Sequence, residues 1–119
     1  MSLYKDMAIA VCKQDFESIK EKHKEVIGDG YIRDISTPDE NYTILYWYYW
    51  NTLSDKDDLM QALRKDIEDI RHSFLSISED GVIQKDVKTD DSRGCDELFE
   101  DILSWRADIT VLGDESDIL

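Results

Sequence analysis

The chain has 119 residues, of which 41% are hydrophobic and 35% are charged, and its formal net charge is −14. This length predicts a single domain spanning residues 1–119, and the hydrophobic fraction excludes an intrinsically disordered chain. The excess of acidic residues excludes direct binding to nucleic acid or to an anionic membrane, because lysine and arginine are what bind phosphate groups. No apolar run approaches the roughly 20 residues of a membrane-spanning helix, and we therefore expect a cytoplasmic protein.

The first third of the chain predicts a helix between two strands. Residues 7–12 are largely apolar and predict a short strand. Apolar residues then recur at spacings of three and four, which predicts a helix over 14–27. Gly28 follows the last apolar residue, where a helix commonly ends, and residues 31–35 predict the second strand.

The central feature is a run of five consecutive aromatic residues, 46–50, at the end of a strand expected over 42–50. The turn-rich segment 36–41 joins this strand to the preceding one as a hairpin. Because alternate side chains of a strand point to opposite faces, the aromatic residues divide into two sets. One face would carry Tyr46, Tyr48 and Trp50 together with Tyr42 and Ile44, and the other would carry Leu45, Trp47 and Tyr49.

Next comes the most regular helical pattern of the chain. Leu59, Leu63 and Ile67 lie on one face, and Ser54 or Asp55 is expected to cap the helix. Two strands follow, over 74–78 and 82–87, and the Asp80-Gly81 step between them predicts a hairpin turn.

The C-terminal part predicts a short helix over 96–103 and a half-buried strand over 105–112. Residues 113–119 are expected to fray, and residues 1–3 could derive from cloning and carry no functional weight. The element order is therefore β-α-β-β-α-β-β-(short α)-β. It predicts an α+β fold, a mostly antiparallel sheet with two main helices packed on one face.

Both faces of the aromatic strand are apolar, so either the strand is covered on both sides or one side is a contact surface. Tyrosine and tryptophan are over-represented at binding hot spots because they combine a large apolar area with a polar tip. Three alternatives stay open: a covered central strand, self-association, and a foreign protein partner. Stacking of nucleic acid bases is disfavoured because the chain lacks a basic groove.

Acidic residues concentrate towards the C-terminus, where residues 74–119 contain thirteen acidic and four basic residues, a net charge of −9. On the short helix, Asp96, Glu97, Glu100 and Asp101 would form a carboxylate edge, because residues three and four apart share a helix face. A basic partner or a divalent cation could offset this charge, and so could ordinary solvation. The oxygen-ligand ladder of calcium loops is not matched by residues 55–66.

The sequence gives little support for catalysis or for a cofactor. His23, on the apolar side of the first helix, is expected to be a packing residue, and His72 lies at the end of the second helix. Cys12 and Cys95 lie far apart and form no CxxC pair, so both are expected to be reduced structural thiols. No phosphate-binding loop, dinucleotide fingerprint or zinc-ligand pattern is found. We therefore expect a non-enzymatic protein without metal or cofactor.

The aromatic strand Leu45-Tyr46-Trp47-Tyr48-Tyr49-Trp50, the acidic-capped helix and the segment Ser78-Glu79-Asp80 together resemble small uncharacterised acidic proteins of prophages and other mobile elements. The resemblance covers residues 42–112. It implies an accessory or inhibitory protein, and it assigns no activity to any residue.

These observations predict a protein that binds a partner protein as an accessory factor or inhibitor, and a basic nucleic-acid-binding protein is a candidate for that partner. The expected anchors are Tyr46, Tyr48 and Trp50, and the expected charged rim is Glu97, Glu100 and Asp101. The alternative is a structural homodimer or oligomer that uses the same aromatic face, with the acidic surface serving only solubility.

Overall fold

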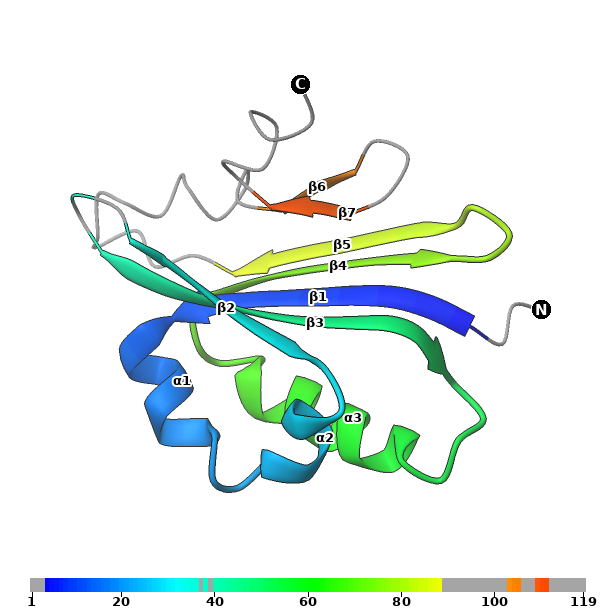
Figure 1. Cartoon of the computed structure of the whole chain (residues 1–119), viewed down its shortest axis with the longest axis horizontal. Coiled ribbons are helices and arrows are strands. Elements are labelled where there is room, and N and C mark those ends of the chain that lie inside the picture. Colours follow the sequence, from blue (N-terminus) through cyan, green and yellow to red (C-terminus); the bar gives the residue numbers. More distant parts are fainter. Residues whose placement is uncertain (1–3, 37, 39, 89–102, 106–108, 112–119) are drawn as a thin grey trace.

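The computed structural model describes residues 4–36, 38, 40–88, 103–105 and 109–111. Its centre is a five-stranded antiparallel sheet in the order β2-β3-β1-β4-β5 (Figure 1). The strands are β1 (Tyr4–Cys12), β2 (Tyr31–Ser36), β3 (Asn41–Asn51), β4 (His72–Ser78) and β5 (Ile83–Lys88). The predicted hairpins β2–β3 and β4–β5 are both confirmed.

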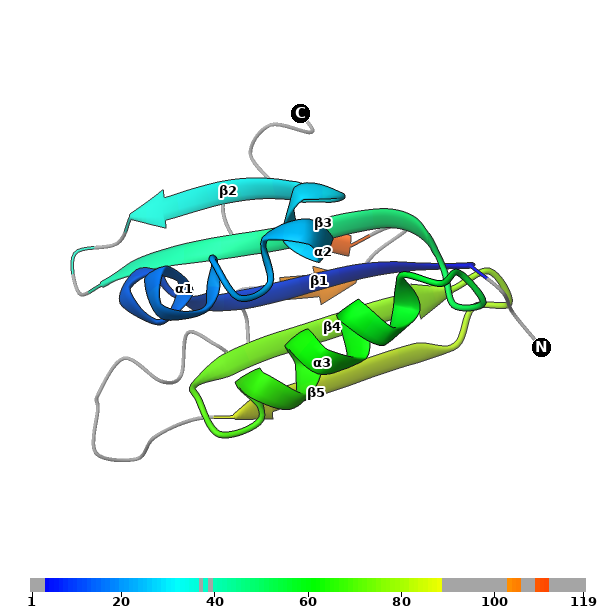
Figure 2. The ribbon, with the colours of Figure 1, turned by 90° about the horizontal axis from the view of Figure 1, so that it is seen from below.

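Three helices cover one face of this sheet, as Figures 1 and 2 show. They are α1 (Lys13–Ile19), α2 (Lys24–Gly28) and α3 (Asp57–Ile67). The predicted α+β fold with its helices on one face is therefore confirmed. The number of helices differs from the prediction, because the expected helix over 14–27 is two short helices.

The break between α1 and α2 lies at residues 20–23 and ends at a buried histidine. Nε2 of His23 lies 2.6 Å from Oδ2 of Asp66 on α3, and Nζ of Lys22 lies 2.8 Å from the same oxygen. These contacts draw the turn towards α3, and α2 then continues in another direction. His23 is thus a packing residue with a polar partner.

The predicted cap of α3, Ser54 or Asp55, is wrong, because the helix begins at Asp57 and its N-cap residue is Lys56. The hydroxyl oxygen of Ser54 accepts a hydrogen bond from the main-chain N–H of Lys56 (3.1 Å), so Ser54 forms a turn just before the helix. A residue of the sheet holds the first helical residue in place, because the indole N–H of Trp50 donates a hydrogen bond to Oδ1 of Asp57 (2.9 Å). Ile70 lies beyond the helix end but still packs against the core.

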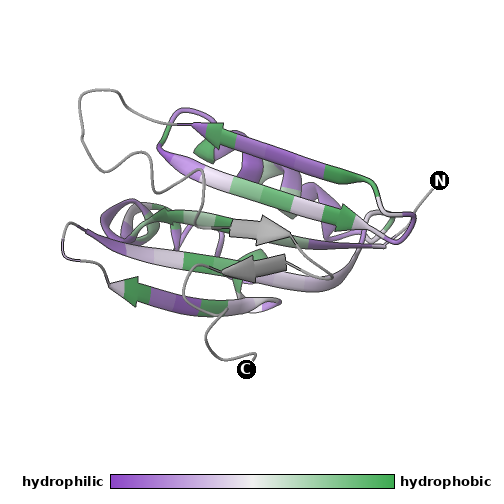
Figure 3. Cartoon of the chain, turned by 90° about the horizontal axis from the view of Figure 1, so that it is seen from above, coloured by the Kyte–Doolittle hydropathy of each residue, from purple (hydrophilic) through white to green (hydrophobic). Residues whose placement is uncertain are grey.

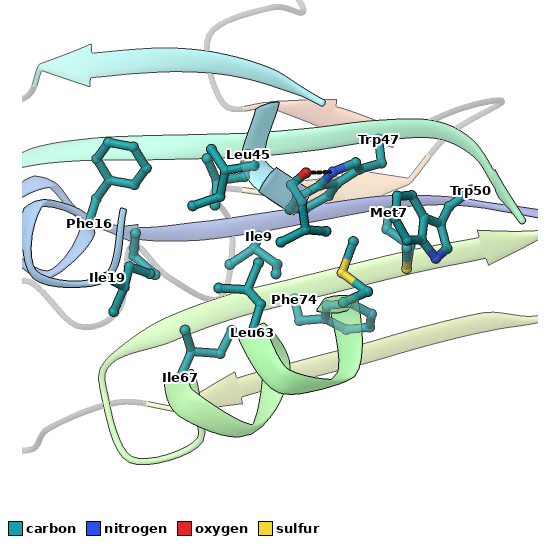
Figure 4. Close-up of a cluster of buried hydrophobic side chains, with 14 residues drawn as sticks. Met7, Ile9, Phe16, Ile19, Leu45, Trp47, Trp50, Leu63, Ile67 and Phe74 are labelled. Atoms are coloured by element: carbon teal, nitrogen blue, oxygen red, sulfur yellow. Dashed lines mark hydrogen bonds between the residues drawn. The ribbon is translucent and has the colours of Figure 1, made fainter. Parts of the chain in front are cut away.

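The main hydrophobic core lies between the helices and the sheet (Figure 4). Along β1 the alternating residues Met7, Ile9 and Val11 face this core, as the two-residue period of a strand requires. The ring of Trp47 is buried here, and its N–H donates to the carbonyl oxygen of Val26 on α2 (2.9 Å). This bond satisfies a polar atom that burial would otherwise leave costly.

The opposite face of the sheet carries a second buried cluster. Ala8 and Ala10 lie along its middle, with Tyr42, Ile44 and Leu75 on either side. Two short paired strands, β6 (Leu103–Trp105) and β7 (Ile109–Val111), lie over this face and contact β1 and β4 (Figure 1). The small alanine side chains let these strands approach the sheet.

The C-terminal prediction is wrong in part. The expected single strand over 105–112 is replaced by the β6–β7 pair, in which Leu103 lies opposite Val111. Sequence alternation did not show that the chain reverses within this segment. Leu103, the last residue of the short helix expected over 96–103, is instead the first residue of strand β6. The other residues of that expected helix lie outside the described residues, and so does the tail 113–119.

The two edge strands, β2 and β5, are mostly exposed. In Figure 3, which views the sheet from the side away from the helices, both have hydrophilic central stretches. These stretches contain Arg33 and Asp34 on β2, and Lys85 and Asp86 on β5. Charged side chains on an edge strand oppose uncontrolled pairing with other chains.

Gly30, between α2 and β2, provides a test of this packing. A Cβ atom at this position would lie 2.6 Å from the carbonyl oxygen of Tyr46 and 2.8 Å from Nε1 of Trp47. We expect Gly30→Ala to lower the free energy of unfolding by about 1–3 kcal/mol, as overpacking does, when measured by urea denaturation. Gly28→Ala is the matched control, because a Cβ there meets no atom within 4 Å. An equal effect of both substitutions would contradict the close approach of Gly30 to β3.

Candidate binding surface on the sheet

The aromatic strand contains a β-bulge that divides its five aromatic residues. On β1, Met7 is opposite Trp47, and two residues earlier Lys5 is opposite Trp50. Tyr48 and Tyr49 are therefore both opposite the single residue between them, Asp6. Such a bulge adds one residue to one strand and interrupts the alternation of its side chains.

Asp6 and an unusual backbone conformation fix this bulge. The main-chain N–H of Tyr49 donates to Oδ1 of Asp6 (2.9 Å). Tyr49 has φ of 52°, the only positive φ among the described non-glycine residues. For a residue with a side chain this left-handed conformation costs about 1–2 kcal/mol. The carboxylate of Asp6 helps to hold a backbone conformation that tyrosine would not favour by itself.

The bulge overturns the predicted grouping of Trp50 with Tyr46 and Tyr48. Trp50 lies in the core between sheet and helices, where its ring makes an edge contact with that of Trp47, with 6.5 Å between the ring centroids (Figure 4). Its side chain is only 8% exposed. Simple alternation had placed it on the other face, because the extra residue cannot be seen in the strand's own sequence.

Tyr46, which precedes the bulge, and Tyr48, its first residue, remain on the face away from the helices. The rings of Tyr46 and Tyr48 lie 4.4 Å apart between centroids, and Tyr31 on β2 makes an edge contact with Tyr48 at 5.7 Å. Tyr46 is buried, whereas Tyr48 is 53% exposed and Tyr31 is 66% exposed. The sequence prediction placed Tyr46 and Tyr48 together correctly, but it did not identify Tyr31, whose position opposite Tyr46 depends on the strand register.

Tyr49, which is 74% exposed, extends this surface towards the first strand. It borders an open cavity of about 620 Å³ at the end of the sheet. The cavity is lined by Tyr4, Lys5, Asp6, Tyr49, Ile77, Ser78 and Glu79. We call the exposed tyrosines Tyr31, Tyr48, Tyr49 and Tyr4 the tyrosine surface. No local sequence pattern indicates the cavity, because its walls come from three strands and a turn.

A second hollow, of about 680 Å³, lies between α3 and β5. The guanidinium of Arg64 stacks 3.9 Å above the ring of Phe74 and lies 3.4 Å from Oδ2 of Asp86. Arg64, one of three cationic residues in the lining, is thus already engaged by an aromatic ring and a carboxylate of the same chain. These contacts of Arg64 are explained by the packing of α3 on the sheet.

The expected charged rim, Glu97, Glu100 and Asp101, lies outside the described residues. Its position relative to the tyrosine surface therefore stays a prediction. Among the described residues no group of three or more histidine, cysteine or acidic side chains could hold a metal ion. None of the described helices has the length and apolar character needed to cross a membrane.

Cys12 lies at the other end of the sheet in a buried polar cluster. Its Sγ lies 3.3 Å from Nη1 of Arg71, which also lies 3.3 Å from Oε2 of Glu40. Burial raises the pKa of the Cys12 thiol to about 12, and a hydrogen bond to Glu40 acts in the same direction, while the charge of Arg71 opposes them. Such a thiol is not a nucleophile at neutral pH, because the thiolate is the reactive form.

On α3, the pKa of Asp66 is lowered by its hydrogen bonds, first to Lys22 and then to His23. His72 is buried at the start of β4, with Nδ1 2.8 Å from the carbonyl oxygen of Ile70. The two histidines therefore have structural partners and lie apart from the tyrosine surface.

Comparison of this chain with protein-family models, with curated proteins and with solved structures finds no match. The functional argument consequently depends on the surface itself.

The state of Cys12 can be tested by alkylation with iodoacetamide. In a Cys95→Ser variant, which leaves Cys12 as the only thiol, we expect almost no reaction of the native protein at pH 8. A pKa of about 12 leaves about one thiol in ten thousand ionised at that pH, and the sulfur is buried. In denaturing urea the same thiol should react as a free cysteine does. Rapid alkylation of the native protein would contradict the buried cluster.

Proposed function

We propose that this chain is a small, cytoplasmic, non-enzymatic protein that binds another protein through its tyrosine surface. The observation that carries the proposal is the exposure of three tyrosines, Tyr31, Tyr48 and Tyr49, of which the first two are in ring contact and the third follows Tyr48 in the bulge. Their rings present a large apolar area, and each has a hydroxyl that can bond to a partner. Exposed aromatic groups of this kind are frequent at the centre of protein interfaces.

The charge of the chain supports a basic partner. At −14 the protein attracts positively charged proteins over long distances and repels acidic ones. Nucleic-acid-binding proteins are the commonest basic proteins of a cell interior, and an acidic protein that occupies their binding surface would act as an inhibitor or accessory factor. Glu97, Glu100 and Asp101 remain candidates for the charged rim.

The expected anchors change with the bulge. Tyr48 remains the central anchor, because its ring lies between those of Tyr31 and Tyr46. Tyr46 packs against the ring of Tyr48 and is itself buried, so it positions this anchor rather than contacting a partner. Trp50 leaves the set, and Tyr31 and Tyr49 join it. A Trp50→Ala substitution would therefore damage the fold rather than report on binding.

The sharpest test uses two residues that are equally exposed. Tyr48 and Ile32 are both 53% exposed, but Ile32 lies opposite Leu45 and so faces the helix side of the sheet. With immobilised protein, a host lysate and elution by a salt gradient, we expect the wild type and Ile32→Ala to retain the same basic protein. Tyr48→Ala should weaken the binding free energy by about 2 kcal/mol, as removal of a hot spot does, and so reduce retention.

The homodimer alternative is tested on the same three proteins by sedimentation velocity. A wild-type monomer, together with selective loss of capture in Tyr48→Ala, supports the proposal. A salt-insensitive dimer that Tyr48→Ala dissociates would assign the surface to self-association instead. Equal capture by Tyr48→Ala and Ile32→Ala would contradict a binding role for the tyrosine surface.

A further inference from the structure

The hollow of about 680 Å³ between α3 and β5 lies on the helix side of the sheet, where Figure 2 shows α3 beside β4 and β5. Its size is that of a site for a small molecule. We infer that this hollow binds a small organic carboxylate through Lys65, Lys88 and His72. The inference goes beyond the proposed function, because Tyr31 and Tyr48 lie on the opposite face of the sheet.

Strand register and the course of α3 bring cationic side chains to this hollow. On β5, Asp86 is opposite Phe74, whose ring lies in the core on the helix side. Because strand residues alternate in direction, Lys88 points to the same side of the sheet as Asp86. Lys65, near the end of α3, lines the hollow as well. The positive groups therefore come from the two elements between which the hollow lies.

The charges of the described lining residues leave a local excess of one positive charge. Arg64 and Asp86 form an ion pair with each other (3.4 Å), so their charges cancel. The remaining charged groups are the ammonium groups of Lys65 and Lys88 and the carboxylate of Glu68. Within the described part of the chain, no ion pair or hydrogen bond engages either lysine side chain. A bound monoanion would neutralise the excess.

The net charge of −14 does not decide what binds in this hollow. At physiological ionic strength the field of a charge is screened beyond about 8 Å, so the nearest groups dominate. The lysines of the hollow therefore favour an anion locally, although the chain as a whole attracts cations.

His72 adds a buried polar group to the lining. The residue is only 8% exposed, and its Nδ1 lies 2.8 Å from the carbonyl oxygen of Ile70. Because a carbonyl oxygen only accepts, Nδ1 carries a proton, and Nε2 has no partner among the described residues. Nε2 is not sealed inside the protein, and His72 lines the hollow. A carboxylate oxygen at Nε2 would form a charge-assisted hydrogen bond with the protonated ring.

The apolar part of the lining favours an organic acid over an inorganic anion. Ile67 and Phe74 belong to the main core, and both also border the hollow. Apolar atoms of a ligand leave water when they lie against such side chains, whereas phosphate gains nothing from this contact. A carboxylate on an apolar body therefore uses both kinds of lining group.

The test uses sodium benzoate, titrated into the ¹⁵N-labelled protein at constant ionic strength and followed by NMR. Benzamide is the matched neutral probe, and inorganic phosphate is an anion without an apolar body. We expect benzoate to shift the amide signals of Lys65, His72 and Lys88 to saturation, with about tenfold weaker binding of the other two probes. Benzoate should also move the ring Nε2 signal of His72. The ring of His23, which is engaged by Asp66, is the internal control.

Four substitutions of exposed residues test the charge argument with opposite signs. Lys65→Gln and Lys88→Gln should each weaken benzoate binding about threefold, as loss of one exposed charge contact does. Glu68→Gln should strengthen binding by a similar factor, because it removes a carboxylate from the lining. Lys85→Gln is the control. It removes the same charge from the same strand, but Lys85 is opposite Leu75 and so faces the other side of the sheet.

Equal binding of benzoate and benzamide, shifts that do not saturate, or an unchanged Nε2 signal of His72 would overturn the inference. A loss of binding in Lys85→Gln as large as that in Lys88→Gln would overturn it as well, because only the net charge would then matter. Tighter binding of phosphate than of benzoate would overturn the assignment of an organic acid. None of these variants alters a residue of the tyrosine surface, so this test and the capture experiment fail independently.

Discussion

One extra residue in β3 determines how the aromatic run is used. With Tyr48 and Tyr49 both opposite Asp6, the strand changes the side on which its later residues point. Trp50 then joins Trp47 in the core, and its indole N–H reaches Asp57 at the start of α3. Without the bulge, Trp50 would lie on the face that carries the tyrosines, and α3 would lose this contact with the sheet. The same residue insertion thus completes the core and exposes the surface.

The two faces of the sheet have different packing partners. Bulky residues of β1 and β3 meet three helices on one side, and a path of small residues, Ala8 and Ala10, admits the β6–β7 pair on the other. The tyrosine surface lies on this second side, where the described residues leave Tyr31, Tyr48 and Tyr49 largely exposed. Large exposed apolar groups commonly mark an interaction site.

Local sequence patterns predicted those elements whose form depends on local forces. The spacing of Leu59, Leu63 and Ile67 predicted α3 because a helix buries one face, and the Asp80-Gly81 step predicted the β4–β5 turn, where Gly81 has φ of 84°. The exact end points and interruptions depended on distant contacts. The break before α2 involves the bond of His23 to Asp66, 43 positions away, and no periodicity within residues 14–27 indicates it. Likewise, the bulge depends on Asp6, which is 43 positions from Tyr49.

Of the candidate site, too, the sequence predicted only the part that depends on local pattern. The aromatic run identified Tyr48 and Tyr46, but Tyr31, Tyr4 and the cavity could be found only from the pairing of strands. The central claim, that the bulge sends Trp50 and Tyr48 to opposite faces, is tested most directly by nuclear Overhauser contacts in solution. The account predicts contacts from the Trp50 ring to Trp47 and from the Tyr48 ring to Tyr31, with the strong intraresidue HN–Hα contact of positive φ at Tyr49. Contacts between the Trp50 ring and the rings of Tyr46 and Tyr48 would mean an uninterrupted strand and would contradict it.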